Sequence, residues 1–390
     1  MENLAAALSE RKRQQLYRAR QTLEGPQDVV VRIDGRDYLS FCSNDYLGLA
    51  RHPSLIAALQ EGAERFGVGS GAAHLITGHS YAHQALEEEL AEFVGRPRAL
   101  LFSTGYMANL GVVSALMGRS DTLYEDRLNH ASLIDAALLS GARLLRYRHL
   151  DTQNLHDKMA RTASGRRLIA TDSVFSMDGD CAPLADLATV AERADAWLLV
   201  DDAHGFGVLG KQGRGWCADQ LAQAPDNSIL MATLGKALGT FGAFVAGSNE
   251  LIETLIQRAR TYIYTTAPPP ALAWATRTAL QLVRDGDDLR ERLTARIRQF
   301  RSGAAELGLA LMSSHTAIQP LLVGEAGAAL ALSEALRERG ILVTAIRPPT
   351  VARGSARLRI TLSARHTPAQ VDRLLETLEI CCGGGQLAAR

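Results

Sequence analysis

The sequence predicts an α/β fold in which a large domain is built on a mostly parallel sheet flanked by helices and a smaller α/β domain follows. Between residues 83 and 248, short apolar runs alternate with segments of helical periodicity, the pattern of a buried parallel sheet. After Pro268-Pro269-Pro270 the pattern changes to longer helical segments. A chain of 390 residues also exceeds what one core usually holds. We therefore predict an arm at 1–40, the large domain at 41–285 and the small domain at 286–390.

The N-terminal arm is predicted to contain an amphipathic helix. Its apolar positions are Leu4, Leu8 and Leu16, and we expect them to dock on the body of the protein or on a partner. The segment lacks the apolar core and cleavage site of a signal peptide, and no later run reaches the length of a membrane span. A cytoplasmic location is the expectation.

The large domain is expected to alternate strands and helices. The runs that predict strands are Ala99–Phe102, Thr122–Tyr124, Arg143–Tyr147, Leu168–Thr171, Trp197–Val200, Ile229–Ala232 and Ala243–Ala246. Helical periodicity marks His83–Val94, Tyr106–Met117, His130–Leu139 and Leu184–Ala194. Ligands of such sheets bind at the carboxyl ends of the strands. Polar residues that directly follow a strand are therefore the candidates for chemistry.

The small domain has its own pattern. One helical region runs from Ala271 to about Leu307. The strands expected after it are Ile318–Val323, Ile341–Ile346 and Ala356–Leu362, and the helices are Ala328–Arg339 and Thr367–Leu378.

Composition narrows the class of ligand. Lys plus Arg and Asp plus Glu each total 42, so the net charge of zero gives no reason to expect nucleic acid or an anionic membrane as partner. The five cysteines include no C-x-x-C pair, and with their odd number this argues against a disulfide framework or a structural zinc site. We expect small-molecule ligands and no metal.

Two carboxylates and an imidazole follow the predicted strand Trp197–Val200. The strand leads into Asp201 and Asp202, and His204 comes two residues later. Charged groups in such a place are costly unless a ligand uses them. The residues alone leave equally open that the acids only cap a turn.

Lys236 follows the next strand, Ile229–Ala232, among small and apolar residues. A lone lysine near a glycine-rich turn is more often a surface charge, but desolvation at the end of a buried strand can lower the pKa of the amine and make it a Schiff-base nucleophile. Pyridoxal 5′-phosphate (PLP) needs an aspartate for its pyridine nitrogen and a lysine for its aldehyde. Asp201 and Lys236 together therefore predict PLP.

The segment from Gly205 to Gly210 matches the G-x-G-x-x-G pattern of dinucleotide-binding folds. In those folds the pattern opens a helix, and an acidic residue follows on the next strand. Here it continues into Lys211-Gln212-Gly213-Arg214-Gly215, which is too polar and too rich in glycine to begin a helix. We expect a turn and no nicotinamide site.

Three further strand ends carry polar residues. Gly105 and Tyr106 follow Ala99–Phe102 at the start of a helix, where free N–H groups and the helix dipole suit a phosphate, although an ordinary N-cap explains such a segment more often. His130 could cap a helix or lie flat against a pyridine ring. Ser176 is the corresponding polar residue after Leu168–Thr171.

With these residues assembled, the chain resembles the α-oxoamine synthases, fold-type I PLP enzymes that join an amino acid to an acyl thioester. The resemblance extends from Arg18 to about Leu378. Its motifs are SNDYLG at 43–48, FSMDGD at 175–180, DDAHG at 201–205 and TLGKALG at 233–239. The segments 317–324, 345–351 and 356–362 resemble the branch that uses L-alanine and a pimeloyl thioester.

The resemblance implies roles for the cofactor residues. Lys236 forms the Schiff base, Asp201 pairs with the pyridinium nitrogen and His204 contacts the phenolic oxygen. His130 stacks on the ring. The remaining cofactor contacts that it implies come from Gly105, Tyr106, Ser176, Thr233 and, from the neighbouring subunit of a homodimer, Thr265 or Thr266.

For the substrates, the resemblance implies that Arg359 clamps the amino-acid carboxylate and that Arg18 and Thr350 face the acyl group. Asn44 and His130 complete the implied substrate contacts. The implied reaction is decarboxylative condensation of L-alanine with pimeloyl-CoA or pimeloyl-acyl carrier protein.

Three other functions compete with this one. They are a glycine-using α-oxoamine synthase that forms aminoketobutyrate or aminolevulinate, a PLP aminotransferase, and a regulatory domain without chemistry. His74 stands where the glycine-using enzymes tend to have Arg, which favours the alanine branch. The intact set of Lys236, Asp201 and His204 argues against a regulatory domain.

Overall fold

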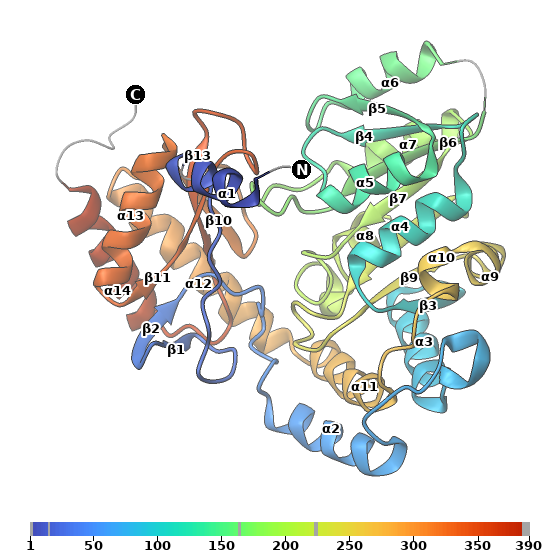
Figure 1. Ribbon diagram of the computed structural model, residues 1–390, viewed down its shortest axis with the longest axis horizontal. Helices are drawn as coiled ribbons and strands as arrows, with labels where there is room; N and C mark the ends of the chain where they lie inside the picture. Colours follow the sequence, from blue (N-terminus) through green and yellow to red (C-terminus); the bar gives the residue numbers. More distant parts are fainter. Residues whose placement is uncertain (1–2, 15, 163–164, 222–224, 384–390) are drawn as a thin grey trace. The chain divides into compact units, whose positions relative to one another are not determined.

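The computed structural model describes residues 3–14, 16–162, 165–221 and 225–383 (Figure 1). They form two compact units. The larger unit consists of Asp45–Ser176 and Asp180–Glu291. The smaller unit consists of the residues up to Asn44, Met177–Gly179, and the chain from Arg292 onward.

A seven-stranded sheet forms the centre of the larger unit, in the order β3-β9-β8-β7-β6-β4-β5. β9 runs antiparallel to β3 and β8 on its two sides, and all other pairs are parallel, so the predicted mostly parallel sheet is confirmed. Each predicted strand is present and differs from its expected bounds by at most a few residues. The strands are β3 (Arg98–Phe102), β4 (Thr122–Asp126), β5 (Arg143–Tyr147), β6 (Arg167–Asp172), β7 (Trp197–Asp201), β8 (Ser228–Thr233) and β9 (Ala243–Gly247).

Helices flank this sheet. The four predicted ones are α3 (Tyr81–Val94), α4 (Gly105–Leu116), α5 (Ala131–Ser140) and α7 (Leu184–Arg193). Those that the sequence did not lead us to expect are α2 (Pro53–Phe66), α6 (Thr152–Ala160), α8 (Trp216–Gln220), α9 (Asn249–Arg258) and α10 (Arg260–Ile263). The apolar sides of α4, α5 and α9 share one core with inward-facing residues of the sheet, such as Val112, Leu133 and Ile252 against Leu199 and Met231. This packing holds the carboxyl ends of the strands in place.

The predicted helical region from Ala271 to Leu307 is two helices. They are α11 (Pro270–Arg284) and α12 (Asp287–Glu306), separated at Asp285 and Gly286. The end of α11 is closed by the N–H of Asp285, which donates to the carbonyls of Gln281 and Val283.

The smaller unit contains two three-stranded sheets. One is β1 (Val30–Ile33), β2 (Arg36–Ser40) and β11 (Ile341–Leu342), and the other is β10 (Ile318–Gly324), β13 (Ala356–Thr361) and β12 (Thr344–Ile346). The predicted strand Ile341–Ile346 is therefore divided between two sheets. The helices are α1 (Leu4–Arg13), most of α12 from Arg292 onward, α13 (Ala326–Glu338) and α14 (Pro368–Cys382).

The N-terminal residues do not form a separate arm, which corrects the predicted division of the chain. Strand β2 pairs in parallel with β11, so the blue N-terminal hairpin in Figure 1 lies beside a strand from the C-terminal part. Helix α1 forms as predicted, but Leu4 and Leu8 are 70% and 49% exposed and none of its described residues is buried. Leu16 lies beyond its end. In the described ranges of the chain, no helix is both long and apolar enough to cross a membrane.

Glu125 is a buried carboxyl group within β4. Among the described residues, neither carboxyl oxygen has a hydrogen-bond partner. Burial raises the pKa of Glu125 to about 8, against the opposing effect of Arg146, its neighbour on β5. Because the pKa in the folded chain lies above the ordinary 4.5, the stability that this group contributes below pH 4.5 is lost as the pH rises to about 8.

Glu125→Gln removes the titration while keeping the size of the side chain. We expect the variant to gain stability relative to the wild type between pH 5 and pH 8, by on the order of 2–4 kcal/mol. Urea unfolding at the two pH values measures this gain. Glu192→Gln, at an exposed position on α7, is the matched control and should show no such gain. An equal stability difference between Glu125→Gln and wild type at both pH values would contradict the assignment.

Candidate active site

A cavity of about 210 Å³ lies at the carboxyl ends of the strands of the larger sheet. This is the place at which ligands of parallel sheets are expected. Its lining comes from the carboxyl ends of β6, β7 and β8 and from the segments that follow β3, β4, β6, β7 and β8. The lining residues are Gly105, Tyr106, His130, Ser132, Asp172, Val174, Ser176, Asp201, Ala203, His204, Met231, Thr233 and Lys236.

The cavity brings together every residue predicted to be catalytic. It also contains every predicted cofactor residue except Thr266, which is exposed and does not line it. The lining residues that sequence reasoning missed include Ser132 and Asp172. The strand-end rule applied to β6 could have found Asp172, because this carboxylate is the last residue of that strand.

Asp201 presents a fixed carboxylate to the cavity. Its Oδ2 accepts a hydrogen bond from Asn109 Nδ2 at 2.9 Å, and its Oδ1 accepts one from the Ala203 N–H at 3.0 Å. Asn109 is itself held by the Ser132 hydroxyl at 2.8 Å. The carboxylate is therefore oriented from two sides while it remains at the cavity wall.

The Asp202 carboxylate is instead held by hydrogen bonds from other residues of the protein. It accepts hydrogen bonds from the Ser173 hydroxyl and from the Cys217 N–H, and it does not line the cavity. Burial raises the pKa of Asp202 to about 7. Of these two acids, only Asp201, the one predicted to meet the pyridine nitrogen, lines the cavity.

The G-x-G-x-x-G segment is a turn, as predicted, and it packs around Asp202. A Cβ atom at Gly205 would lie 2.1 Å from Asp202 Oδ1, so no larger residue fits there. Gly207 has a φ of +86°, a conformation that favours glycine. Gly205 thus serves the packing of a carboxylate, whereas a Cβ atom at Gly207 would meet Ala237.

The Lys236 side chain is linked through His204 to Tyr46 by polar contacts. Its Nζ lies 2.9 Å from His204 Nε2, and His204 Nδ1 lies 2.7 Å from the Tyr46 hydroxyl. Tyr46 is buried and fixes the imidazole, a contact that could have been suspected because Tyr46 belongs to the SNDYLG motif. The other three lysines of the sequence, Lys12, Lys158 and Lys211, do not line the cavity.

The N-terminus of α4 also lines the cavity. Thr104 caps the helix by accepting the Met107 N–H at 3.1 Å, so the ordinary N-cap is present. In the described part of the chain, the N–H groups of Gly105 and Tyr106 donate to no protein acceptor. Two free donors and the positive end of a helix make this wall suitable for an anion such as phosphate.

His130 and Asp172 form another part of the lining. His130 Nδ1 contacts the Ser132 hydroxyl at 2.8 Å and caps α5, while its ring remains exposed. The backbone N–H of His130 donates to Asp172 at 3.1 Å. Burial, together with the charge of Asp201, raises the pKa of Asp172 well above its usual range.

The predicted substrate residues Arg18, Asn44, Thr350 and Arg359 belong to the smaller unit. Arg359 lies on β13 and donates to the Asn44 side chain at 3.1 Å. Arg18 and Thr350 are exposed and lie outside the helices and strands. The substrate roles of these residues stay predictions.

His74 lies in a short π-helix, His74–Gly78, of the larger unit. Its ring stacks on Tyr262 with the ring centres 4.8 Å apart. Burial lowers the pKa of His74 to about 3, so this imidazole is neutral at physiological pH. It therefore lacks the charge that an arginine would have at this position.

Comparison with known proteins shows the family to which the chain belongs. Residues 36–378 match the family described as aminotransferase class I and II. One similar solved structure is a serine palmitoyltransferase from S. paucimobilis with a bound PLP-myriocin aldimine, with a TM-score of 0.91 and 29% identity over 97% of this chain and 96% of that one. Another is an 8-amino-7-oxononanoate synthase from Francisella tularensis, with a TM-score of 0.77 and 34% identity over 89% of this chain and 98% of that one. The chain therefore belongs to the class I and II aminotransferase family, with the fold of the type I PLP enzymes.

Within this family the similarity can be stated more narrowly. The chain is 65% identical to an 8-amino-7-oxononanoate synthase of Nitrosococcus oceani, over 95% of this chain and 98% of the relative. This relative confirms the predicted resemblance to the branch that uses alanine and pimeloyl.

Proposed function

We propose that the protein is a PLP-dependent 8-amino-7-oxononanoate synthase. It condenses L-alanine with a pimeloyl thioester and releases 8-amino-7-oxononanoate, CO2 and the free thiol carrier, which is a step of biotin biosynthesis. The observation that carries the proposal is the placement of the Lys236 amine and the fixed Asp201 carboxylate in one cavity. The chain that forms this cavity is similar to such synthases over nearly its whole length.

The residues of the cavity fit PLP. The free N–H groups of Gly105 and Tyr106 suit the phosphate, and Thr233 and Ser176 add hydroxyl groups nearby in the lining. Asp201 is the partner for the pyridine nitrogen, Lys236 binds the aldehyde, and the exposed ring of His130 is available to cover the pyridine face.

When bound, PLP supplies a sink for electrons released at Cα of the amino acid. Asp201 sustains this sink, because a fixed negative charge keeps the pyridine nitrogen protonated. Lys236 Nζ is the group in the cavity that can take the α-proton of alanine and return it later. His204, held by Tyr46, orients the lysine amine at 2.9 Å.

The choice of substrates depends on further predicted contacts. Arg359 has the guanidinium geometry that suits a carboxylate, and it is already oriented by Asn44. Arg18 and Thr350 are proposed to contact the acyl group. Thr266 is proposed to reach the phosphate in a second subunit of a homodimer, which agrees with its absence from the cavity of its own chain.

A substrate matrix tests the proposed function. We expect release of CoA to be fastest with L-alanine plus pimeloyl-CoA, because a pocket fitted to the longer chain gains about 0.8 kcal/mol for each buried methylene. The control reactions are glycine with pimeloyl-CoA, L-alanine with acetyl-CoA, and glycine with acetyl-CoA. Equal kcat/KM for glycine plus acetyl-CoA would assign the protein to the glycine-using branch. Conversion of the amino acid to a keto acid without release of CoA would identify an aminotransferase.

A further inference from the structure

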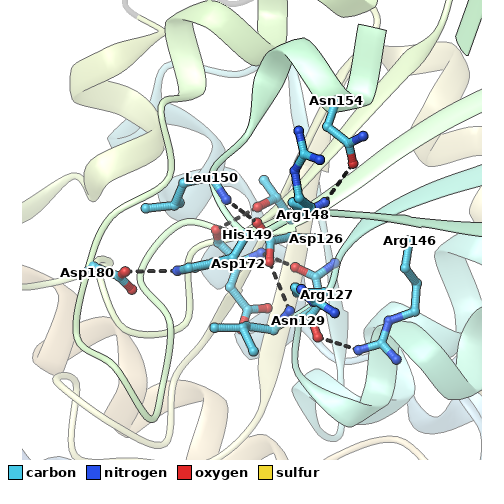
Figure 2. Close-up of polar contacts among 12 residues, drawn as sticks. Asp126, Arg127, Asn129, Arg146, Arg148, His149, Leu150, Asn154, Asp172 and Asp180 are labelled. Carbon is cyan, nitrogen blue, oxygen red and sulfur yellow. Dashed lines mark hydrogen bonds and ion pairs between the residues drawn. The ribbon is translucent and has the colours of Figure 1, made fainter. Parts of the chain in front are cut away.

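His149 lies just after β5, outside the lining of the cavity, and connects two segments that contribute to it (Figure 2). Its Nδ1 contacts Asp126 Oδ1 at 2.9 Å, and its Nε2 contacts Asp180 Oδ2 at 2.8 Å. Asp126 is the last residue of β4. Asp180 belongs to a hairpin closed by the bridge between Val174 and Cys181. Both ring nitrogens are therefore engaged, one by each segment.

Asp126 fixes the loop that carries His130. Besides His149, it accepts the N–H of Leu128 at 2.9 Å and the N–H of Leu150 at 2.8 Å. Asn129, in the same loop, adds a second attachment, because its side chain donates a hydrogen bond to the Ala170 carbonyl at 2.8 Å. The loop thus runs from a buried carboxylate directly to a residue of the cavity wall.

Asp180 fixes the hairpin that carries Ser176. Its carbonyl accepts the Phe175 N–H at 3.0 Å. The His149 ring packs edge-on against the Phe175 ring, with the ring centres 4.4 Å apart. Ser176, the next residue, lines the cavity. One imidazole therefore contacts the aromatic side chain of Phe175, just before a cofactor residue, and the carboxylate of Asp180, four residues after it.

Charge explains why a histidine is suited to this place. Burial lowers the pKa of His149, but the hydrogen bonds and charges of Asp126 and Asp180 outweigh this effect and raise it to about 9. The ring is thus a cation between two carboxylates at neutral pH. Leu150, immediately after it, has a φ of +56°, a strained conformation for leucine that Asp126 holds through the N–H.

We propose that His149 is a positioning residue of the PLP site, which holds the His130 loop and the Ser176 hairpin in place through its contacts with Asp126 and Asp180. The part of this proposal that concerns PLP depends on the proposed function. The part that concerns the two segments can be tested without the cofactor.

Hydrogen exchange of the cofactor-free protein is the first test. In His149→Ala, backbone amides in 127–130 and in 173–181 should exchange at least about tenfold faster than in the wild type, because both anchors are lost. His156→Ala is the matched control, since His156 lies on α6 with a side chain that is 63% exposed. It should exchange like the wild type.

The second readout is the dissociation constant of added PLP. Loss of a residue that orients the groups contacting a cofactor typically weakens binding by about 10–100-fold, and we expect His149→Ala to fall in this range. His156→Ala should bind PLP like the wild type. Faster exchange in both segments together with weaker binding supports the proposal, whereas either effect alone contradicts it.

Asp180→Asn keeps the test informative if His149→Ala does not fold. This variant preserves the shape of the side chain and leaves the contact between His149 and Asp126. We expect faster exchange in 173–181 only, and binding of PLP that is weakened by a smaller factor. Exchange and binding equal to the wild type would overturn the proposal. Absence of PLP binding by the wild-type protein would instead refute the proposed function and leave the exchange result valid.

Discussion

Lys236→Ala should abolish turnover and the visible absorption of lysine-bound PLP. The amine is both the group that binds the aldehyde and the base for the α-proton, and no other lysine lines the cavity. We expect kcat to fall by at least about 10⁴-fold. PLP should still bind without a covalent bond, since the N-terminus of α4 and Asp201 are unchanged. Absorbance titration with PLP and a CoA-release assay measure the two effects.

Lys211→Ala is the matched control for this prediction, because Lys211 is exposed and lies outside the cavity. It should keep both the visible absorption and the turnover. Reduction of the wild-type protein with borohydride, followed by peptide mapping, should label Lys236 alone among the four lysines of the sequence. A label on Lys12, Lys158 or Lys211 would refute the assignment of the cofactor lysine.

Asp201→Asn should retain PLP and lose most of the activity. Asparagine has nearly the same shape, and its single carbonyl oxygen can still accept a hydrogen bond from one of the two donors, Asn109 or Ala203. It carries no charge, however, so it does not keep the pyridine nitrogen protonated. Loss of a fixed charge directed at developing charge costs about 10²–10³-fold in kcat. Steady-state kinetics with L-alanine and pimeloyl-CoA, at saturating PLP, measures this loss.

Asp202→Asn distinguishes this role from a general effect of removing an acid at the end of β7. Asp202 is held by Ser173 and Cys217 and does not line the cavity, so we expect its replacement to change stability more than kcat. Nearly normal turnover in Asp201→Asn, with a large loss in Asp202→Asn, would show that the other acid faces the pyridine nitrogen.

Much of the fold could be predicted because the strands of the larger sheet, apart from the edge strand β5, are buried on both faces. Such strands appear in the sequence as continuous apolar runs, and each predicted run became a strand. The pairing of β2 with β11 could not be predicted in this way, because it joins residues about 300 positions apart and leaves no local pattern. For the same reason residues 1–40 were assigned to a separate arm, although the structure places them in the smaller unit.

The cavity could be predicted because the chemistry of PLP needs particular residue types at the ends of strands. The residues that were missed act mainly on other protein groups. Asn109 orients Asp201, and Tyr46 orients His204, across long distances in the sequence. His149 is the second residue after β5, so the strand-end rule applied to Arg143–Tyr147 could have identified it.

The most direct test of the proposed function is the fate of the carbon atoms of alanine. The protein would be supplied with pimeloyl-CoA and, in separate reactions, with L-alanine labelled with 13C at the carboxyl group or at the methyl group. Mass spectrometry of the product should show 8-amino-7-oxononanoate that retains the methyl label and has lost the carboxyl label as CO2. Pyruvate that retains the carboxyl label, or no product beyond the unreacted substrates, would contradict the proposed function.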